Sequence, residues 1–387
     1  MNYSIDRDYI IQTLTDLVRI NSANPSLSPD GKGEAELGGY VAGELSKLGL
    51  AVDSYELEPG RVNIVGVLKG SGNGRSLLLN AHMDTVGIDG MVIDPFGAEI
   101  HDGRMYGRGS QDMKASLAAM LSVAKAFVDG GVELAGDLLI TAVADEEYAS
   151  LGTEDLVKHV KADAAIVTEP TDLTICRAHR GFIWYDVETF GRAAHGSRFE
   201  EGIDANMRMG RFLAQLDKLE QELRQRTAHP LAGPPSLHAA QIRGGAEISI
   251  YADHCYLQIE RRTIPGETEA QATAELQAII DRLAAEDPTF KATVKPTFER
   301  DPFEVSLDAS IVQILDQVMV TQLGHKSAHT GQTFWTDAAL LAEAGMETVL
   351  LGPTGYGLHS AEEWVDLQSV VKLANILAET AVIYCQS

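Results

Sequence analysis

Residues 76–84 read SLLLNAHMD, an apolar run followed by two side chains that carry chemistry. A short run of this kind, bounded by polar residues, is typical of a strand that is buried on both faces of a parallel sheet. His82 and Asp84 follow the run directly. In open α/β sheets the loops at the carboxyl ends of the strands converge on one crevice, so the position of His82 predicts a functional site at that edge.

Three further apolar runs end next to carboxylate or imidazole side chains. They are residues 138–144 before Glu146 and Glu147, residues 164–167 before Glu169, and residues 348–351 before the loop with His359. Asp112 lies between a glycine-rich turn, residues 107–109, and an apolar helical pattern. Any one of these residues taken alone is more simply explained as structural. Unrelated structural roles would rarely place such groups just beyond four different buried strands. Taken together, these residues therefore predict one site.

The residue types at this predicted site indicate a divalent metal ion. Carboxylates and imidazoles without thiolates suit Zn²⁺ or a similar ion. Two ions need one bridging ligand, and Asp112 can offer one oxygen to each. We therefore expect His82 and Glu169 on one ion, and Glu147 and His359 on the other.

The remaining acidic residues predict the proton chemistry. Asp84 lies two residues after His82, so in an extended segment its carboxylate can accept the second N–H of the imidazole. Glu146 and Glu147 diverge if their backbone is extended, which leaves one of them free, and we expect Glu146 to be the general base. A metal-bound water loses its proton readily. The predicted reaction is amide hydrolysis, in which Glu146 returns the proton to the leaving nitrogen.

Composition excludes several classes of partner and compartment. The 387 residues exceed one typical core and predict two domains. A formal net charge of -25 argues against a nucleic acid or an acidic membrane as partner. The three cysteines are too scattered for a disulfide framework, no apolar stretch reaches the length of a membrane span, and the first residues lack a signal-peptide pattern. We therefore expect a cytoplasmic protein.

The pattern of predicted strands and helices changes near Gly181. From there the patterns run strand, helix, two strands, helix and strand, which describes a ferredoxin-like βαββαβ module inserted in a longer α/β chain. We predict a discontinuous catalytic domain, residues 1–178 and 295–387, with a central, mostly parallel sheet. The inserted domain is residues 179–294. The glycine-rich segment at residues 70–74 (GSGNG) predicts a hairpin turn, because it lacks the lysine and the following helix of a phosphate loop.

Seven motifs occur along essentially the whole chain in a recognisable order. They are AHMDTV, YGRGSQDMK, DEEYASLGT, TEPT, GRAAHGSR, ERRTIPGET and GLHSAEEW. This ordered set resembles the zinc-dependent aminoacylase and carboxypeptidase family that includes acetylornithine deacetylase, succinyl-diaminopimelate desuccinylase and bacterial glutamate carboxypeptidase. The resemblance implies two Zn²⁺ ions per subunit, with Co²⁺ or Mn²⁺ as substitutes. It also implies the roles assigned above: His82, Asp112, Glu147, Glu169 and His359 as ligands, Asp84 as the partner of His82, and Glu146 as the catalytic carboxylate.

The resemblance also assigns roles in the inserted domain, which it implies is a lid and dimerisation domain. His195 would reach the site of a neighbouring subunit in a homodimer and help to hold the oxyanion. Arg262 would bind a substrate carboxylate, a task that suits a planar guanidinium, and Arg261 is its rival. The chain departs from the common family motif at Gln111, which precedes the bridging aspartate, and at residues 115–116, where glycines are frequent. These departures leave the substrate open.

The expected activity is hydrolysis of the amide bond of an N-acyl amino acid, as in acetylornithine deacetylase. The alternatives are a carboxypeptidase or dipeptidase, whose substrates are short peptides, or an activity like that of succinyl-diaminopimelate desuccinylase. A non-catalytic metal-binding relative is disfavoured, because Glu146 and all the expected ligands are present.

Overall fold

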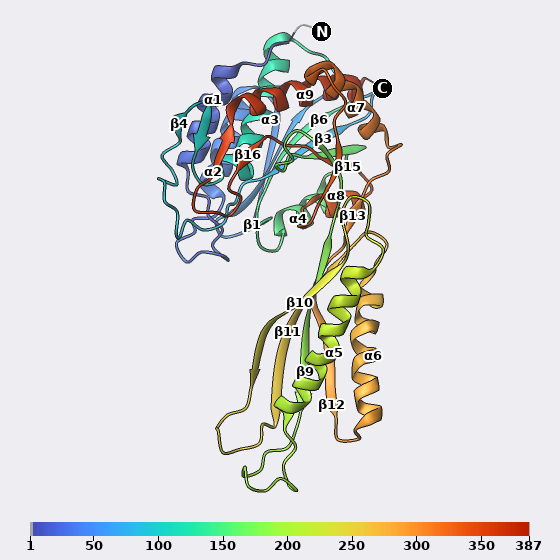
Figure 1. Ribbon diagram of the computed structural model, residues 1–387. Coiled ribbons are helices and arrows are strands. Elements are labelled where there is room, and N and C mark those ends of the chain that lie inside the picture. Colours follow the sequence, from blue (N-terminus) through green and yellow to red (C-terminus); the bar gives the residue numbers. More distant parts are fainter. Residues whose placement is uncertain (1–2, 387) are drawn as a thin grey trace. The chain divides into compact units, whose positions relative to one another are not determined.

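The computed structural model describes residues 3–386, and the chain folds into two compact units (Figure 1). The first unit contains Met1–Arg177, Val305–Thr330 and Thr336–Ser387, and the second contains Ala178–Glu304 and Gly331–Trp335. The second unit is thus inserted in the chain of the first. Its role as a lid and dimerisation domain stays a prediction.

One mixed sheet forms the centre of the first unit. Its four middle strands are parallel and stand in the order β6, β3, β7 and β15. These strands are β6 (Leu138–Val143), β3 (Leu77–His82), β7 (Ala164–Val167) and β15 (Glu347–Leu350). Every residue of β6, β3 and β7 is buried, as expected for continuous apolar runs. The four strands that were predicted to lead into site residues are therefore neighbours in the sheet.

Antiparallel strands extend this parallel core. β1 pairs with β2 and β2 with β6 on one side, while β8 pairs with β15 on the other. β13 and β14 pair with β8. The bounds are β1 (Ala51–Glu58), β2 (Arg61–Leu68), β8 (Ile175–His179), β13 (Phe303–Glu304) and β14 (His329–Gln332). The sheet is mixed, and its parallel pairing lies in the middle strands.

Helices cover both faces of this sheet (Figure 1). α1, α2, α3, α7 and α9 lie on one face, and α4 and α8 lie on the other. The bounds are α1 (Arg7–Arg19), α2 (Ala35–Lys47), α3 (Ala115–Gly130), α4 (Leu151–His159), α7 (Ser310–Leu323), α8 (Ala338–Glu343) and α9 (Leu367–Cys385). α3 is buried almost all round because it contacts the sheet, α1 and α9 at once. Within the described residues, we find no helix whose length and apolar character would suit a membrane crossing.

A small antiparallel sheet joins two distant parts of the first unit. Its strand order is β16, β17, β5 and β4. The bounds are β4 (Glu99–His101), β5 (Arg104–Tyr106), β16 (Gly355–Tyr356) and β17 (Trp364–Asp366). Trp364 lies opposite Tyr106, so the loop that contains His359 runs beside the turn that contains Asp112.

The glycine-rich segment at residues 70–74 does not form the predicted hairpin. β2 and β3 are not neighbours, because β6 lies between them and pairs with both. Backbone hydrogen bonds join the segment to Leu134 and Ala135 instead. A Cβ atom on Gly136 would lie 1.9 Å from the oxygen of Arg75. The glycines therefore permit a close approach of two segments instead of a tight turn.

The second unit has the predicted βαββαβ order, and its sheet is antiparallel in the order β10, β11, β9 and β12. α5 and α6 pack on one face, where Ile183, Tyr185 and Val187 of β9 are buried. The bounds are β9 (Gly181–Phe190), α5 (Ala205–Gln225), β10 (Ser236–Gly244), β11 (His254–Thr263), α6 (Glu269–Glu286) and β12 (Lys291–Arg300). This arrangement is ferredoxin-like. The predicted boundary at residue 294 falls inside β12.

Candidate active site

The carboxyl ends of β3, β6, β7 and β15 share one edge of the sheet, because these strands are parallel. The loops that leave this edge carry most of the predicted ligands, and the turn before α3 carries Asp112. Within the first unit the structure brings five predicted ligands together: His82, Asp112, Glu147, Glu169 and His359.

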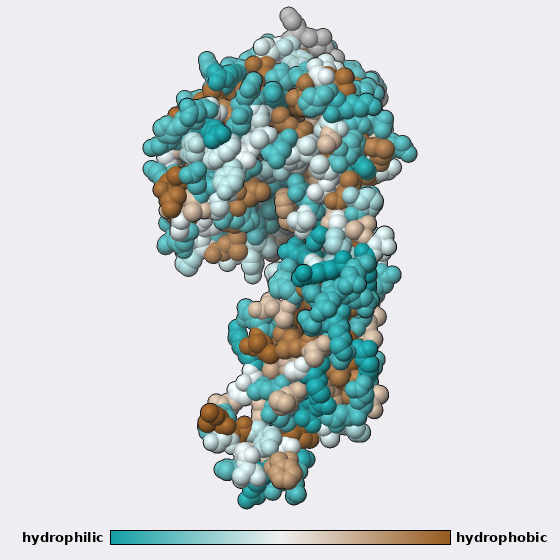
Figure 2. Space-filling view, in the orientation of Figure 1, coloured by the Kyte–Doolittle hydropathy of each residue, from teal (hydrophilic) through white to brown (hydrophobic). Residues whose placement is uncertain are grey.

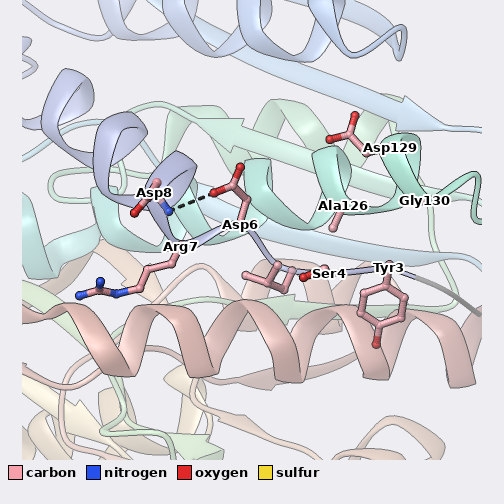
Figure 3. Close-up of a pocket in the computed structure, with 9 residues that line it drawn as sticks. Tyr3, Ser4, Asp6, Arg7, Asp8, Ala126, Asp129 and Gly130 are labelled. Carbon is pink, nitrogen blue, oxygen red and sulfur yellow. Dashed lines mark hydrogen bonds between the residues drawn. The ribbon is translucent and has the colours of Figure 1, made fainter.

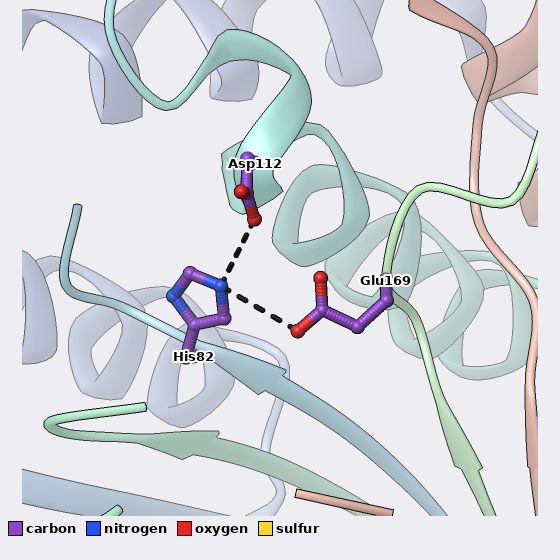
Figure 4. A group of neighbouring side chains, drawn as sticks. All are labelled: His82, Asp112 and Glu169. Atoms are coloured by element: carbon purple, nitrogen blue, oxygen red, sulfur yellow. Dashed lines mark hydrogen bonds and ion pairs between the residues drawn. The ribbon is translucent and has the colours of Figure 1, made fainter. Parts of the chain in front are cut away.

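Three of these side chains form a first group, shown in Figure 4. Nε2 of His82 lies 3.1 Å from Oδ1 of Asp112 and 3.7 Å from Oε1 of Glu169. One donor atom of each residue lies within 4.8 Å of the others. Nδ1 of His82 is 2.9 Å from the main-chain oxygen of Asp84, which favours the tautomer that leaves Nε2 free for a ligand.

Asp112, Glu147 and His359 form a second group. Nε2 of His359 lies 2.9 Å from Oε2 of Glu147 and 3.5 Å from Oδ2 of Asp112. Asp112 thus turns Oδ1 toward one group and Oδ2 toward the other. It lies in the π-helical turn Ser110–Lys114, where its own φ and ψ are not helical.

The electrostatics of these groups fit a bound cation. Burial, followed by the charges of neighbouring carboxylates, raises the pKa of Glu146 and of Glu169 well above the usual range. Hydrogen bonds to Asp112 and Glu147 raise the pKa of His359 to about 10. Among the described residues, the buried Oε1 of Glu147 has no hydrogen-bond partner. Crowded carboxylates and an unpartnered oxygen are what a divalent ion would satisfy, and these donors suit zinc.

Asp84 contacts His82 in a different way from the predicted one. Its Oδ1 lies 3.6 Å from Nδ1 of His82, so the main-chain oxygen of Asp84, not the carboxylate, accepts the imidazole hydrogen. The carboxylate accepts the backbone N–H groups of Glu146 at 3.1 Å and Glu147 at 3.2 Å. The expected extended backbone is absent here, because Asp145 has a φ of 69° and the chain turns. Asp84 therefore holds the turn that carries both glutamates.

A buried polar network continues behind Asp84 and was not predicted from the sequence. Nδ2 of Asn24 donates to Asp84 at 2.8 Å and to Asp145 at 2.9 Å. Arg61 donates to Asp145 at 2.7 Å and to Glu34 at 2.6 Å. All of these residues are buried. Their partners are remote in the chain, so no local motif links them.

Asp337, at the start of α8, is a further buried residue that was not predicted from the sequence. It is buried and accepts the hydroxyl of Thr153 at 2.6 Å. Burial raises the pKa of Asp337 to about 6, and its charge in turn raises the pKa of Glu146 and of Glu169. The only sequence signal is an aspartate ahead of a short apolar run.

The side chains at and beside the departures from the common family motif make local contacts. Ser116, where a glycine is frequent, donates its hydroxyl to the oxygen of Thr168, one residue before Glu169. Lys114, which precedes the two departures at residues 115–116, is fully buried, donates to the oxygen of Ile20 at 2.8 Å, and has its pKa lowered to about 7 by burial. Neither residue displaces a predicted ligand.

His195, Arg262 and Arg261 lie in the second unit, so the two ligand groups of the first unit contain none of them. His195 is part of a loop, and its Nδ1 is 2.9 Å from the hydroxyl of Ser197. Arg262 donates to Glu260 at 2.7 Å, and its guanidinium lies 5.1 Å from the ring centroid of Phe182. Arg261 is buried and paired with Glu267. Of the two arginines, Arg262 is the more accessible.

A separate surface pocket lies where the segment before α1 passes the end of α3 (Figure 3). Its polar wall includes Asp6, Asp8 and Asp129. Asp6 accepts the N–H of Asp8 at 3.0 Å and so caps α1. This pocket contains none of the predicted site residues.

An α/β fold that gathers carboxylates and imidazoles into two groups with a shared aspartate defines a class, the metal-dependent hydrolases. Residues 78–382 match the model of Peptidase family M20/M25/M40, and the chain belongs to this family. As a member of a peptidase family, the protein is a hydrolase that acts on amide bonds.

Curated relatives are similar over almost their whole length. The chain is 28% identical to N-formyl-4-amino-5-aminomethyl-2-methylpyrimidine deformylase of Bacillus subtilis, with 92% of this chain and 91% of that protein covered. It is 29% identical to acetylornithine deacetylase of Myxococcus xanthus, with 96% and 97% covered.

Solved structures share the fold. Aminopeptidase PepT from Bacillus cereus matches with a TM-score of 0.81 at 18% identity, over 99% of this chain and 100% of that one. The Bacillus subtilis YXEP protein, described as a dinuclear metal-binding peptidase of the M20 family, matches with a TM-score of 0.77 at 15% identity, over 98% of each chain.

Proposed function

We propose that the protein hydrolyses the amide bond of an N-acyl amino acid with two bound zinc ions. The observation that carries this proposal is the pair of side-chain groups that share Asp112. Similarity to the Myxococcus acetylornithine deacetylase over nearly the full length of both chains supports the substrate class.

The ligands divide between the ions as their distances suggest. His82 and Glu169 would hold one ion, Glu147 and His359 would hold the other, and Asp112 would contribute to both. The two oxygens of Asp112 lie at 3.1 Å and 3.5 Å from different imidazoles, which supports a bridge. Zinc suits imidazole and carboxylate donors, and Co²⁺ or Mn²⁺ would accept the same set.

Glu146 is the general base and acid of this proposal. Bound zinc would supply a water of lowered pKa and a polarised carbonyl. Glu146 receives the proton of the attacking water and delivers it to the departing nitrogen. In the metal-free protein, burial and the charge of Glu169 raise the pKa of Glu146. Asp84 fixes the backbone of Glu146 through the N–H group that it accepts.

The second unit contributes substrate and subunit contacts. Arg262 binds the substrate carboxylate, and His195 acts in the site of the neighbouring subunit of a homodimer. Strongly exposed apolar side chains support a partner surface there: Phe199 is 73% exposed and Ile248 105%. Figure 2 shows apolar side chains at one end of this unit. The backbone of His195 pairs with Ile250, so the loop of His195 belongs to the same region.

Removal of a formyl group is a second candidate function, favoured by the similarity to the Bacillus deformylase. This reaction also cleaves an amide, so the same residues would serve, but the substrate would need no carboxylate. We propose the cytoplasm as the compartment, supported by three buried cysteines that form no disulfide.

Substrate turnover tests the proposal directly. The zinc-loaded protein is assayed with N-acetyl, N-formyl and N-succinyl amino acids, with the formylated aminomethylpyrimidine, and with unblocked dipeptides. We expect the fastest turnover with an N-acyl amino acid. Glu146→Gln should bind zinc as the wild type does but lose about 10²-fold or more in kcat. Near-normal turnover by Glu146→Gln would refute the role of this residue, and preference for dipeptides would refute the substrate class.

A further inference from the structure

Glu363 is a buried carboxylate to which the predicted site assigns no role. Its side chain is 1% exposed and accepts four hydrogen bonds. Oε1 accepts the backbone N–H groups of Gln111 at 2.9 Å and Asp112 at 3.0 Å. Oε2 accepts the backbone N–H of Gly109 at 3.0 Å and Nη1 of Arg108 at 2.8 Å. Both oxygens therefore hold the turn that presents Asp112.

Arg108 is buried as well and connects this turn to two further loops. Its Nε donates to the oxygen of Gly87 at 3.1 Å, and its Nη2 donates to the oxygen of Ser360 at 3.0 Å. Gly87 lies in the loop that follows His82, and Ser360 is next to His359. One guanidinium thus joins three segments that carry predicted ligands, a task that its planar fork suits.

The small antiparallel sheet brings Arg108 and Glu363 together from distant parts of the chain. β5 ends just before Gly107, and β17 begins just after Glu363. The N–H of Gly107 donates to the main-chain oxygen of Glu363 at 3.1 Å. The charge pair therefore lies where the two paired strands meet the site.

His359 needs such support, because its backbone is strained. Its φ is 58°, in the left-handed region that few residues other than glycine adopt. A conformation of this kind persists only where neighbouring contacts impose it. The hydrogen bond from Arg108 to Ser360 is one such contact.

We propose that Arg108 and Glu363 form a positioning pair that holds Asp112 and His359 where the two metal ions need them. The inference rests on the proposed function, because it takes both residues as ligands. Neither member of the pair belongs to a ligand group, so the pair acts through the backbone that it holds. Residues in this kind of position typically change metal affinity or activity by about 10- to 100-fold when they are replaced.

Glu363→Gln is the sharpest test, because an amide cannot satisfy the same donors. Both carboxylate oxygens of Glu363 accept from N–H groups only. Whichever way the amide lies, its NH₂ group faces donors, and Arg108 loses its charge partner in a buried place. Glu362→Gln is the matched control, because Glu362 is the exposed neighbour in the chain.

We expect Glu363→Gln to weaken zinc binding by about 10- to 100-fold, measured by competition with a chelator, while Glu362→Gln binds as the wild type does. Hydrogen exchange of residues 107–113 in the metal-free variant should be faster. kcat should fall while KM stays within about twofold. Unchanged zinc affinity, exchange and kcat, with only a lower melting temperature, would show a merely structural pair and overturn the inference.

Arg108→Lys is the second variant, in case Glu363→Gln does not fold. Lysine keeps a positive charge beside Glu363 but loses the fork to Gly87 and Ser360. We expect the backbone N–H groups of the Asp112 turn to stay protected, while one of the two zinc ions, the one next to His359, binds more weakly. If the variant binds each of the two ions with the same affinity as the wild type does, the proposed role of Arg108 is contradicted.

These outcomes separate the inference from the proposed function, because zinc binding and exchange are measured without substrate. A wild-type protein that binds two zinc ions but cleaves no amide refutes the proposed function and leaves the pair testable. A wild-type protein that cleaves N-acyl amino acids, with a Glu363→Gln variant of equal zinc affinity and kcat, refutes the pair alone.

Discussion

Asp112 and its neighbours show how one small region shifts the pKa values of adjacent carboxyl groups in opposite directions. Burial would raise the pKa of Asp112, but hydrogen bonds from His359 and His82 lower it below the usual range. Glu146 behaves in the opposite way, because burial and the charge of Glu169 raise its pKa. Divergent pKa values among adjacent carboxyl groups are typical of enzymes in which one group binds a cation and another carries a proton.

Asp337 gives a pH-dependent prediction at the same scale. In the folded protein its pKa is about 6, above the usual value of 3.8. Between these two pH values the unfolded chain releases the proton first, so stability falls as the pH rises, and the full cost persists above pH 6. Asp337→Asn removes this cost. In metal-free protein we expect the variant to be more stable than the wild type by roughly 3 kcal/mol at pH 8 and by only about 0.5 kcal/mol near pH 4.

Urea unfolding of the chelator-treated proteins at pH 4 and pH 8 measures this difference. The substitution keeps an oxygen that can accept the hydroxyl of Thr153, so the charge is the main change. If the variant is less stable than the wild type at pH 8, the charge of Asp337 does not lower the free energy of unfolding, and the prediction is contradicted.

At the scale of single residues, the sequence predicts the side chains that form the two groups but not the residues that hold them in place. His82 and Glu169 follow short, continuous apolar runs, which a local pattern reveals. The carboxylate of Asp84 was expected at the imidazole but lies against the turn of Glu146, because the positive φ of Asp145 was not visible in the sequence. Glu363 and Arg108 also escaped prediction, since their pairing depends on strands that are distant in the chain.

At the scale of elements, strand existence was easier to predict than strand order. The four middle strands of the main sheet are continuous apolar runs, and the βαββαβ unit has clear periodicity. The prediction of a hairpin at residues 70–74 was wrong, because β6, which comes much later in the chain, lies between β2 and β3. Which strand enters between two others depends on packing across the whole sheet, and short-range sequence patterns do not contain it.

Gly136 supplies the test at this scale. An added Cβ would lie 1.9 Å from the oxygen of Arg75, so Gly136→Ala must displace backbone. We expect it to destabilise the protein by about 3 kcal/mol or more in denaturant unfolding. Gly43→Ala is the control, because a Cβ on Gly43, within α2, would meet nothing within 4 Å. That variant should be more stable by about 0.5–1 kcal/mol, and equal effects of both substitutions would contradict the close approach.

At the scale of the whole molecule, the chain leaves the first unit at Ala178 and returns at Val305, and the short segment Gly331–Trp335 belongs to the second unit as well. All five predicted ligands lie in the first unit, whereas His195 lies in the second. If His195 serves a neighbouring subunit, the active unit is the homodimer, and two differently damaged subunits should complement each other.

Mixing Glu146→Gln with His195→Ala protein tests this complementation. Each mixed dimer would contain one site with an intact Glu146 and an intact partner His195, so activity should recover to about a quarter of the wild-type value after subunit exchange. Mixing Glu146→Gln with Asp112→Asn should recover nothing, because both residues lie in the same unit of one chain. Absence of recovery in the first mixture, with exchange demonstrated, would place His195 in its own subunit's chemistry or in none.

Anomalous diffraction at the zinc edge, from crystals grown with excess zinc, tests the two-ion site most directly. We predict two peaks per subunit, one bonded to His82 and Glu169 and the other to Glu147 and His359, with Asp112 bonded to both. A single peak, or peaks away from these side chains, would contradict the account.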